Sequence, residues 1–388
     1  MRLGVVGGKL QGIECTYLAG KAGYEVVVID RHRAAPALSL ADEVVILDVV
    51  SQVEETKRVL SDCDAVLPAN EELTTLTALD RICRQIKVPL LFDLEAYRTS
   101  SSKVLSNELL RELNVPMPLP WPECGYPVVV KPSSFSGSVG VMRADNGADL
   151  ARGLQRVKGL NDAAVVQEFV EGPNISIEVI GDGDRAVPLV TTEVILDESY
   201  DCRMVLCPLP GVDQETEGSF REWGRRIAER MSIRGIMDVE AIVHKGVPKV
   251  LEIDARMPSQ TPAAAYNATG VNLVEVLVGA IVGKRLEEPV PKQGAAIYEH
   301  LAVDGATMRS CGEGTFAQVR QPRLMKNLFG SDEMITDYEP GRKSWKATMI
   351  CTGATPEEAW ERRNGCIDRI IESNQISQYI VPSTEGRT

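Results

Sequence analysis

The sequence lacks any long apolar run, and no segment approaches the ~18 consecutive apolar residues that a membrane helix requires. Its nine cysteines include no Cys-x-x-Cys pair, so neither a zinc knuckle nor a disulfide framework is indicated. Positive charge is in deficit, with 42 Lys and Arg against 55 Asp and Glu, which argues against nucleic acid or an anionic membrane as a partner. The amino terminus also shows no charged and apolar leader. We therefore expect a reduced, cytoplasmic protein.

Histidine is scarce as well. His32, His244 and His300 form no recognisable triad or metal-binding spacing, so we expect structural roles for them. The remaining composition is ordinary for a globular chain, with 388 residues of which 44% are hydrophobic. This length predicts two or three packed units.

Short apolar strands alternate with helical stretches over about the first 95 residues, which predicts a parallel α/β sheet. The predicted strands are Leu3–Val6, Glu25–Asp30, Glu43–Leu47 and Ala65–Pro68. A helix is expected at Ala96–Leu113, and the proline-rich stretch after it ends that helix. Further strands are expected at Pro127–Lys131, Gly140–Arg143, Ala164–Val170, Ile175–Ile180 and Ala186–Leu196, and further helices at Phe220–Met231, Val271–Val282 and Pro356–Asn374.

A glycine-rich turn, Gly7-Gly-Lys-Leu-Gln-Gly12, follows the first predicted strand. It fails the dinucleotide fingerprint because Lys9 stands where the second glycine would be needed. An NAD-dependent dehydrogenase is therefore disfavoured. The turn still leads into a helix amino terminus, whose free N–H groups can bind an anion or another ligand. A turn needed only for chain reversal is an equally good interpretation.

An acidic hairpin is predicted between Gly235 and Arg256, with a turn that carries Gly246 and Pro248. Because side chains alternate along a strand, Asp238 and Glu240 share one face of the first strand. Glu252, Asp254 and Arg256 share one face of the second. Antiparallel pairing would bring Glu240, Glu252 and Asp254 together, and such a group suits Mg²⁺ completed by phosphates and water. The alternative is a solvated hairpin face.

A small-residue loop, Pro132–Gly140, follows the predicted strand that delivers Lys131. Its backbone N–H groups and the Ser138 hydroxyl can cradle phosphates, with Lys131 as a point charge. It is no Walker A loop, and a serine-rich surface loop is the alternative. Lys103 lies in a predicted helix 28 residues before Lys131. A single helical lysine is usually a solvated residue, so only this spacing gives it weight.

These elements occur in the order typical of the ATP-grasp superfamily, which the chain resembles over roughly residues 1–290. The resemblance implies an α/β ATP-grasp fold preceded by a Rossmann-like (pre-ATP-grasp) domain. The implied domains are 1–95 for the pre-ATP-grasp domain, 96–172 for the lid, and 173–388 for the large domain with a carboxy-terminal extension. ATP and Mg²⁺ are the implied cofactors. The implied metal ligands are Glu240, Glu252 and Asp254, and the implied nucleotide contacts are Lys103, Lys131, Ser138, Gln167, Glu168, Phe169, Val170 and Glu171.

A closer resemblance is to the pyrrolysine-biosynthesis ligases, which join the carboxylate of (3R)-3-methyl-D-ornithine to the ε-amine of L-lysine. It rests on Gly7–Gly12, Leu67–Glu71, Phe92–Arg98, Ser176–Gly183, Tyr200–Cys202, Gly235–Ala241, Glu252–Pro262 and Tyr298–His300. The resemblance implies that Lys9 and Glu71 hold L-lysine, and that Leu10 and Gln11 lie in the same pocket, in reach of the cofactor. The D-substrate would contact Ser176, Ile177, Glu178, Asp238, Arg256, Ser259, Gln260 and Thr261.

One departure concerns the ribose. Asn174 stands where many ATP-grasp enzymes have a ribose-binding acid, so the ribose contact is expected to shift to Glu171. The implied chemistry is transfer of a phosphoryl group to the carboxylate, followed by attack of the amine on the acyl phosphate. Arg256 and Lys131 would steady the transferred group, and Asp238 or Glu178 would take the proton from the amine.

Other functions remain open from the sequence. Another ATP-grasp ligase, of the purine-pathway or D-alanine-ligase kind, would use most of the same motifs. A regulatory protein that binds ATP without turnover is a further alternative, although it would not need three acids and Arg256 together. The expected partners are the small-molecule substrates, 3-methyl-D-ornithine and L-lysine, and a homodimer is possible.

Overall fold

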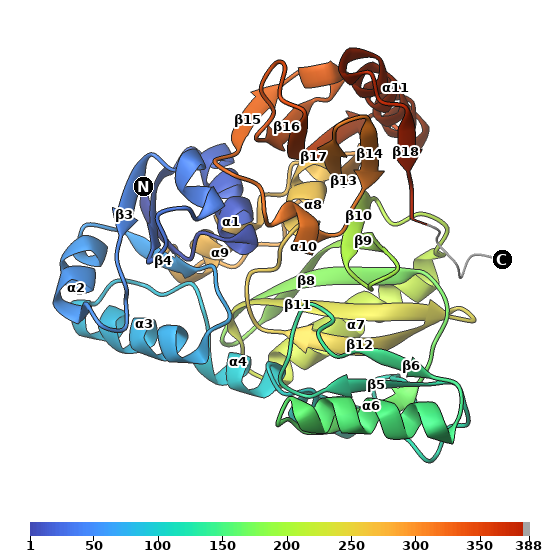
Figure 1. Cartoon of the computed structure of the whole chain (residues 1–388). Coiled ribbons are helices and arrows are strands. Elements are labelled where there is room, and N and C mark those ends of the chain that lie inside the picture. Colours follow the sequence, from blue (N-terminus) through green and yellow to red (C-terminus); the bar gives the residue numbers. More distant parts are fainter. Residues whose placement is uncertain (383–388) are drawn as a thin grey trace.

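The computed structural model of the chain describes residues 1–382, which form three β-sheets with helices packed around them (Figure 1). The smallest sheet has three strands, the amino-terminal sheet four, and the largest eleven. The small sheet lies at the bottom of Figure 1, below the acidic hairpin, and the amino-terminal sheet lies to the left. The large sheet continues through the centre to the top of the molecule.

The amino-terminal sheet is parallel throughout and has the order β3-β2-β1-β4. Parallel strands end at one common edge, so the turns after β1, β2 and β4 lie together there. This edge carries the glycine-rich turn, Asp30 and the segment that leads to Glu71. The elements are β1 (Arg2–Val6), α1 (Leu10–Lys21), β2 (Glu25–Asp30), η1 (Pro36–Leu40), β3 (Glu43–Ile46), α2 (Val53–Ser61), β4 (Ala65–Pro68) and α3 (Leu73–Ile86).

The middle of the chain forms an antiparallel sheet of order β6-β5-β7, covered on one side by α6. The preceding helical region is two helices rather than the single predicted helix at Ala96–Leu113. Ser102 breaks it, because its hydroxyl accepts a hydrogen bond from the backbone N–H of Leu105 and caps a new helix. The elements are α4 (Leu94–Ser100), α5 (Lys103–Glu112), β5 (Val128–Pro132), β6 (Met142–Ala144), α6 (Gly147–Gly159) and β7 (Ala164–Glu168).

The large sheet follows the order β12-β11-β8-β9-β10-β13-β17-β16-β15, and β14 and β18 pair beside β13. The strands after residue 290 are therefore not a separate appendage, because they extend the same sheet. The elements before that point are β8 (Asn174–Asp182), β9 (Ala186–Leu196), β10 (Cys202–Cys207), α7 (Gln214–Arg230), β11 (Arg234–His244), β12 (Val247–Asp254), α8 (Thr261–Thr269) and α9 (Leu273–Ile281). The later elements are β13 (Ala295–Asp304), β14 (Thr307–Ser310), α10 (Glu313–Phe316), β15 (Arg323–Lys326), η2 (Leu328–Gly330), β16 (Glu333–Thr336), β17 (Ser344–Gly353), α11 (Pro356–Asn374) and β18 (Gln378–Ile380).

Two predicted boundaries differ from the structure for local reasons. The hairpin turns at Lys245 and Gly246, whereas Pro248 lies inside β12 opposite Val243. Pro248 is tolerated because β12 is an edge strand, where one N–H faces no partner strand. The helix expected at Phe220–Met231 already begins at Gln214, because Asp213 caps it through the backbone N–H of Thr216.

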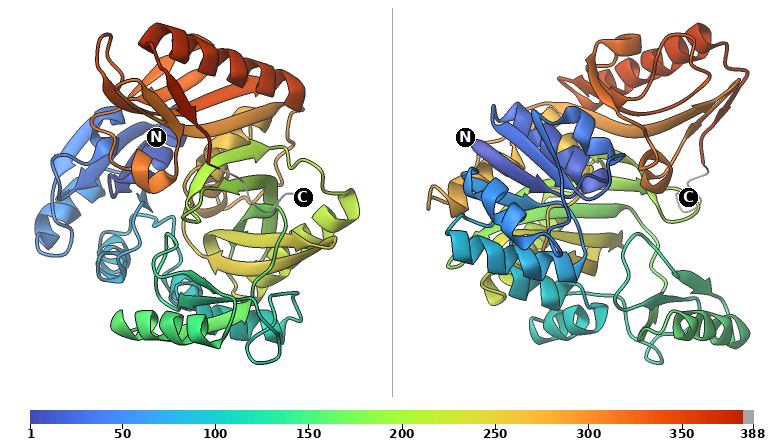
Figure 2. Two further views of the ribbon diagram at one scale, coloured as in Figure 1. Left: turned by 45° about the vertical axis from the view of Figure 1, so that its right-hand side comes forward. Right: turned by 60° about the vertical axis from the view of Figure 1, so that its left-hand side comes forward.

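Helix α1 anchors the amino-terminal domain to the large sheet. Its buried residues Ile13 and Leu18 belong to one hydrophobic cluster with residues of α8, α9 and β13. Polar contacts reinforce this packing: Tyr17 donates to Glu333 at 2.7 Å, and the Tyr298 hydroxyl donates to the fully buried Glu14. The two views of Figure 2 show the amino-terminal domain packed beside the helices and strands of the large sheet.

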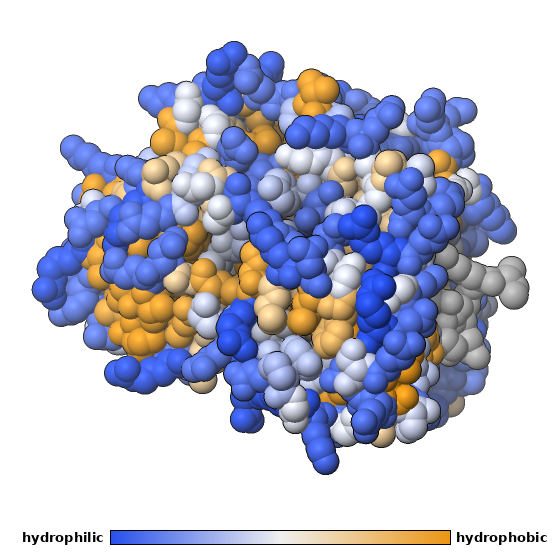
Figure 3. Space-filling model, turned by 90° about the horizontal axis from the view of Figure 1, so that it is seen from above, coloured by the Kyte–Doolittle hydropathy of each residue, from blue (hydrophilic) through white to orange (hydrophobic). Residues whose placement is uncertain are grey.

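The face seen in Figure 3 is mostly hydrophilic, with apolar patches between the polar side chains. Within residues 1–382, no single helix is long and apolar enough to cross a membrane. Among the same described residues, the pair α8 and α9 has sufficient length and apolar composition together, and the two helices are bent by 98° at the break between them.

A first prediction concerns the close approach of β8 to the segment before β11. A Cβ added at Gly181 would lie 2.3 Å from the carbonyl oxygen of Ile233, so the backbone must shift. We expect Gly181→Ala to destabilise the fold by about 1–3 kcal/mol, read as a lower Tm in thermal unfolding. Gly218→Ala is the matched control, because it lies in α7 with open space around it and should gain about 0.5–1 kcal/mol of stability. Equal Tm values for both variants would contradict the close approach.

A second prediction concerns pH. Burial raises the pKa of Glu14 to about 7, although the Tyr298 hydroxyl opposes the shift. The unfolded chain has a glutamate pKa of about 4.3, so between that pH and about 7 the folded state holds a proton that the unfolded state has lost. The free energy of unfolding therefore falls as the pH rises through this window. We expect the Tm of the wild type to fall more between pH 5 and 8 than that of Glu14→Gln, and equal slopes would contradict this.

Candidate active site

The acidic hairpin brings its carboxylates onto one face as predicted. Glu240 lies directly opposite Glu252, and Asp238 lies opposite Asp254. Like charges directly opposite each other destabilise a sheet, so this arrangement requires compensating cations. Glu240 retains contact with solvent. The surrounding protein nevertheless desolvates its carboxylate, and this desolvation together with the charges of Asp238 and Glu252 raises its pKa.

Two lysines supply part of the compensating charge. Lys103 lies 2.8 Å from Glu252 and also donates to the carbonyl of Phe135 at 2.7 Å. A β-bulge after Glu240 leaves Leu251 without a partner in the β11–β12 register, and its carbonyl accepts a hydrogen bond of 3.2 Å from Lys131. Burial lowers the pKa of Lys131 to about 8, although Glu252 opposes the shift. Both lysines therefore lie against the hairpin.

Arg256 connects the hairpin to the amino-terminal domain. Its guanidinium lies 2.9 Å from Asp254 and 2.8 Å from Glu71, which follows β4. Glu71 also accepts a hydrogen bond of 3.1 Å from Gln11 and another from Ser136 of the small-residue loop. Glu71 thus contacts residues from three separate parts of the chain, Arg256, Gln11 and Ser136.

The next strand, β8, extends the acidic face. Glu178 is paired in register with Asp238, and Ser176 with Glu240. Ser176 donates to Asp238, and Thr261 donates to Glu178. Both carboxylates are buried. Burial raises the pKa of each above its ordinary value, and for Asp238 the charge of Glu178 adds to this shift.

Ile177 differs from its neighbours. It was predicted to bind the D-substrate, but its side chain points to the opposite face of β8 and is fully buried in the hydrophobic cluster with Met237 and Val239. Alternation along the strand explains this, because residues at odd and even positions face opposite sides. Only the main chain of Ile177 is available to a ligand.

The small-residue loop lies against another loop of the large sheet. Ser138 has a positive φ of 55°, and its hydroxyl donates to the carbonyl of Tyr200 at 2.8 Å. Gly137 and Gly140, on either side, also have positive φ values of 60° and 78°. This backbone conformation explains the need for glycines in the loop. The predicted phosphate contact of Ser138 requires its hydroxyl to leave Tyr200.

The predicted adenosine-binding segment shows several different environments. Gln167 is 4% exposed, and its Oε1 atom has no hydrogen-bond partner among the described residues. Glu168 pairs with Lys249 at 2.6 Å, and the Phe169 ring lies 4.3 Å from the Arg143 guanidinium. Val170 is buried, whereas Glu171 is exposed and its carbonyl lies 3.0 Å from His244 Nδ1. Gln167 is thus the buried side chain of this segment with unmet hydrogen-bonding capacity.

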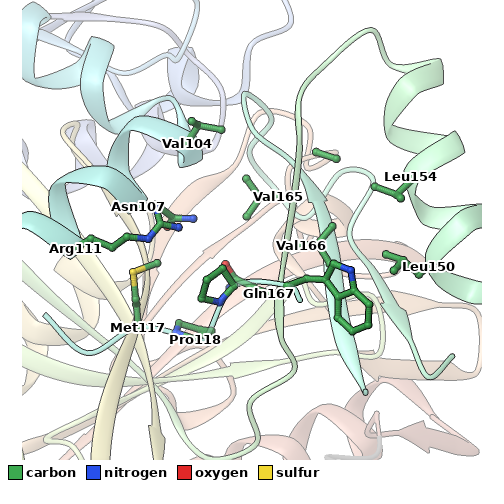
Figure 4. A pocket seen from close by; sticks show the side chains of 13 residues that line it. Val104, Asn107, Arg111, Met117, Pro118, Leu150, Leu154, Val165, Val166 and Gln167 are labelled. Atoms are coloured by element: carbon green, nitrogen blue, oxygen red, sulfur yellow. The ribbon is translucent and has the colours of Figure 1, made fainter. Parts of the chain in front are cut away.

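A pocket of about 370 Å³ lies on the edge of β7, beside Gln167 (Figure 4). Val104, Asn107 and Arg111 line it from α5, and Leu150 and Leu154 from α6. None of the hairpin carboxylates belongs to its lining. The pocket therefore lies beside the acidic face and is not its centre.

The glycine-rich turn positions Lys9 and Leu10 at the start of α1. Lys9 is exposed and forms no side-chain cap, whereas Leu10 is half-buried against the main cluster. The Asp30 carboxylate accepts a hydrogen bond of 2.7 Å from the backbone N–H of Gly8, which fixes the turn. Among the described residues Lys9 has no ion pair with Glu71, since Glu71 pairs with Arg256 instead. A shared role for Lys9 and Glu71 stays a prediction.

Sequence reasoning missed Glu313, the first residue of α10. Its carboxylate accepts hydrogen bonds from Ser259 at 3.2 Å and from the Gln260 side chain at 3.1 Å. Gln260 also contacts the buried ring of His300 at 2.9 Å. Burial lowers the pKa of His300 to about 3, which keeps the ring neutral and supports the structural role expected for it. No motif marks Glu313, because its position depends on strands that pair late in the chain.

The donor set suits a metal that arrives with a nucleotide. No three Asp, Glu, His or Cys side chains of residues 1–382 form a ready-made metal site. Glu252 forms an ion pair with Lys103, and Asp254 forms one with Arg256. The Oδ1 atom of Asp254 is buried and has no hydrogen-bond partner among the described residues, and Glu240 is open to solvent. Mg²⁺ takes only a few carboxylate oxygens and fills its other positions with phosphate and water, so these residues fit it.

Comparison with known proteins agrees with this geometry. The ATP-grasp domain model matches residues 100–260, and the model of the PylC-like, N-terminal domain matches residues 3–91. The ADP complex of an N5-carboxyaminoimidazole ribonucleotide synthetase has a TM-score of 0.71 at 15% identity, covering 96% of this chain and 97% of that one. Biotin carboxylase from Campylobacter jejuni has a TM-score of 0.74 at 14% identity, covering 95% and 91%. These structures confirm the predicted fold class.

The sequence relatives are more specific. The 3-methyl-D-ornithine--L-lysine ligase of Methanosarcina mazei is 40% identical over 369 residues, which cover 93% of each protein. That of Methanosarcina acetivorans is 41% identical over 299 residues, covering 76% of this chain and 78% of the relative. The chain therefore belongs to the ATP-grasp superfamily and, within it, to the family of the 3-methyl-D-ornithine–L-lysine ligases.

Proposed function

We propose that this protein uses ATP to join the carboxylate of 3-methyl-D-ornithine to the ε-amine of L-lysine, forming ADP and phosphate. The observation that carries the proposal is the hairpin, which gathers Glu240, Glu252 and Asp254 beside Lys103, Lys131 and Arg256. The names of the relatives supply the substrates. The predicted cytoplasmic location and homodimer belong to the same proposal.

The nucleotide would lie between the small sheet and the hairpin. Lys103 and Lys131 reach this space from α5 and β5, and both can transfer their hydrogen bonds from Glu252 and two carbonyls to phosphate oxygens. The unpaired Oε1 of Gln167 suits an amino group such as that of adenine. Bound Mg²⁺ would neutralise the phosphate charge beside Glu240, Glu252 and Asp254.

A carboxylate does not accept an amine at neutral pH, so it must first become a better electrophile. Transfer of the γ-phosphoryl group gives an acyl phosphate, and the barrier falls when fixed positive charges surround the transferred group. Arg256 is suited to this because Asp254 and Glu71 both pair with its Nη2 atom and so fix the guanidinium in place. Its position therefore needs little reorganisation during the reaction.

The attacking amine must lose a proton, since its pKa is about 10.4 in water. Asp238 and Glu178 are candidates for the base, because both are buried carboxylates of the acidic face and burial raises the pKa of each toward the working pH. A base with a pKa close to the working pH transfers protons well. Ser176 and Thr261 orient the two carboxylates through hydrogen bonds.

The order of the two steps is testable. With ATP, Mg²⁺ and D-ornithine but no lysine, we expect hydroxylamine to trap an activated acyl group and ADP to be released. L-lysine offered alone should give no trapping, because its carboxylate is not the donor. Trapping only with L-lysine would reverse the two substrates. ADP release only with substrates other than D-ornithine and L-lysine would favour another ATP-grasp ligase. Tight ATP binding without turnover would favour a regulatory protein.

A variant of Glu240 tests whether the hairpin takes part in this chemistry. Glu240→Gln leaves the apolar face of β11 untouched, so its Tm should stay close to that of the wild type. It removes one charged donor from the proposed metal site, and trapping should therefore fall by at least 100-fold. Near-normal trapping in the folded variant would contradict the assignment of Glu240.

The amino-terminal domain is proposed to bind L-lysine. Lys9 can pair with the α-carboxylate of an amino acid, and Glu71 can accept hydrogen bonds from its ammonium group. We expect Lys9→Ala to raise the KM for L-lysine by at least tenfold, while trapping with D-ornithine stays nearly normal. Glu71→Gln should impair both steps, because Glu71 also holds Arg256. Equal loss of both steps in Lys9→Ala would instead place Lys9 in the nucleotide site.

A further inference from the structure

Helix α4 lies between the amino-terminal domain and the acidic hairpin, and it contacts both α3 and β12 (Figure 1). The segment Phe92–Arg98, which forms most of this helix, carries part of the family resemblance. Its side chains nevertheless supply none of the carboxylates or cations of the acidic face. A role for this helix must therefore come from the residues that it holds in place.

The start of α4 is fixed against the start of β11. The Asp93 carboxylate caps the helix by accepting the backbone N–H groups of Glu95 and Ala96. It also accepts the backbone N–H of Arg234 at 3.0 Å. A Cβ added at Gly235 would lie 3.3 Å from the backbone nitrogen of Asp93, so the two segments are in close contact. Helix α4 therefore keeps one position relative to the hairpin.

Two side chains of α4 reach the main chain on either side of the ion pair between Arg256 and Glu71. The Tyr97 hydroxyl donates to the Glu71 carbonyl at 2.8 Å. Three residues further along the same helix face, the Ser100 hydroxyl accepts the backbone N–H of Ala255 at 2.9 Å, directly before Arg256. Tyr97 is 5% exposed and Ser100 is 2% exposed. One short helix thus supports the backbone of both partners of the ion pair.

The hydrogen bond from Tyr97 is important for the backbone of Glu71. Among the described residues, no other hydrogen bond is made to the backbone N–H or the carbonyl of Glu71. Glu71 lies in the loop between β4 and α3, and its carboxylate is shared by Gln11, Ser136 and Arg256. Removal of the Tyr97 hydroxyl therefore frees the backbone of the residue on which these three contacts converge.

The ring and the hydroxyl of Tyr97 have different surroundings. The ring belongs to a hydrophobic cluster with Ile253, and its centre lies 5.4 Å from that of the Phe92 ring. Burial raises the pKa of the hydroxyl, and the charges of Asp254 and Glu71 add to this shift, so the hydroxyl keeps its proton and remains a donor. Tyr97→Phe would therefore keep the ring contacts and remove only the hydrogen bond.

We infer that Tyr97 and Ser100 are positioning residues for the reaction, and that they act by holding Glu71 and Arg256 at a fixed separation. The inference rests on the proposed function, because it presupposes that Glu71 binds L-lysine and that Arg256 steadies the transferred phosphoryl group. The amine and the acyl phosphate are then aligned by one ion pair, whose two backbone supports come from α4. A shift of either support would misalign the reacting groups.

The test measures ADP release by Tyr97→Phe with ATP, Mg²⁺, D-ornithine and L-lysine. We expect kcat to fall at least fivefold and the KM for L-lysine to rise at least threefold, because Glu71 no longer keeps its position. The KM for ATP should change less than twofold, since the proposed nucleotide contacts are untouched. Tyr379→Phe is the matched control, because it also removes one hydroxyl, which accepts a hydrogen bond of 2.6 Å from Arg363. All three constants should stay close to those of the wild type in this control.

A double-mutant cycle separates positioning from a general weakening of the fold. If Tyr97 acts through Glu71, adding Tyr97→Phe to Glu71→Ala should change kcat less than twofold, because the side chain that Tyr97 positions has been removed. Losses that multiply in the double variant would overturn the inference. A lower kcat of Tyr97→Phe with an unchanged KM for L-lysine would reflect loss of folded protein, and it would overturn the inference as well.

The outcomes also separate the inference from the proposed function. No lysine-dependent ADP release by the wild type would contradict the proposed function and, with it, the inference that rests on it. An active wild type with an unchanged Tyr97→Phe variant would overturn the inference alone. If Tyr97→Phe does not fold, Ser100→Ala removes the other support and leaves the tyrosine in place. It should lower kcat and raise the KM for L-lysine in the same way, and wild-type constants in this variant would contradict the inference.

Discussion

The pairing of Arg256 with Asp254 and Glu71 is the interaction on which the site depends. Without a cation at this point, the carboxylates of β8, β11 and β12 would repel one another on a single face of the sheet. The guanidinium pairs with both carboxylates through one nitrogen, Nη2. It also connects the hairpin to the edge of the amino-terminal sheet. Two substrates bound in separate domains can therefore both reach the Arg256 guanidinium.

The amino-terminal domain is held to this arrangement by helix α1. The glycine-rich turn lies at the start of the helix, and Glu14 lies one turn further on, where the Gln260 backbone lowers its pKa and the Tyr298 hydroxyl donates to it. The same helix therefore presents the proposed lysine site and fixes the turn at the proposed D-substrate site. Because both depend on one rigid element, the distance between the two substrates is set by packing and not by a flexible linker.

The sequence predicted the parts of this molecule that depend on local alternation. The faces of β11 and β12 followed from period-two spacing, and the strands Glu25–Asp30 and Ala65–Pro68 were predicted at their observed bounds. The capping effect of Ser102 was missed because a single serine inside a helical pattern is a weak signal. The bulge that frees Leu251 and the contact of Glu313 with Gln260 could not be predicted, since both depend on tertiary register. The roles of Lys9, Ser138 and Glu171 stay predictions.

The continuity of the large sheet has a consequence for how such a protein can be divided. β13 lies between β10 and β17, so a strand of the ATP-grasp region and strands from after it share one ladder of hydrogen bonds. A fragment ending near residue 260 would leave β10 as an open edge, and it would lack α8, which packs in one hydrophobic cluster with α1. Recombination or gene fusion that exchanges only the nucleotide-binding part is therefore disfavoured, and the chain is expected to be inherited as an indivisible unit.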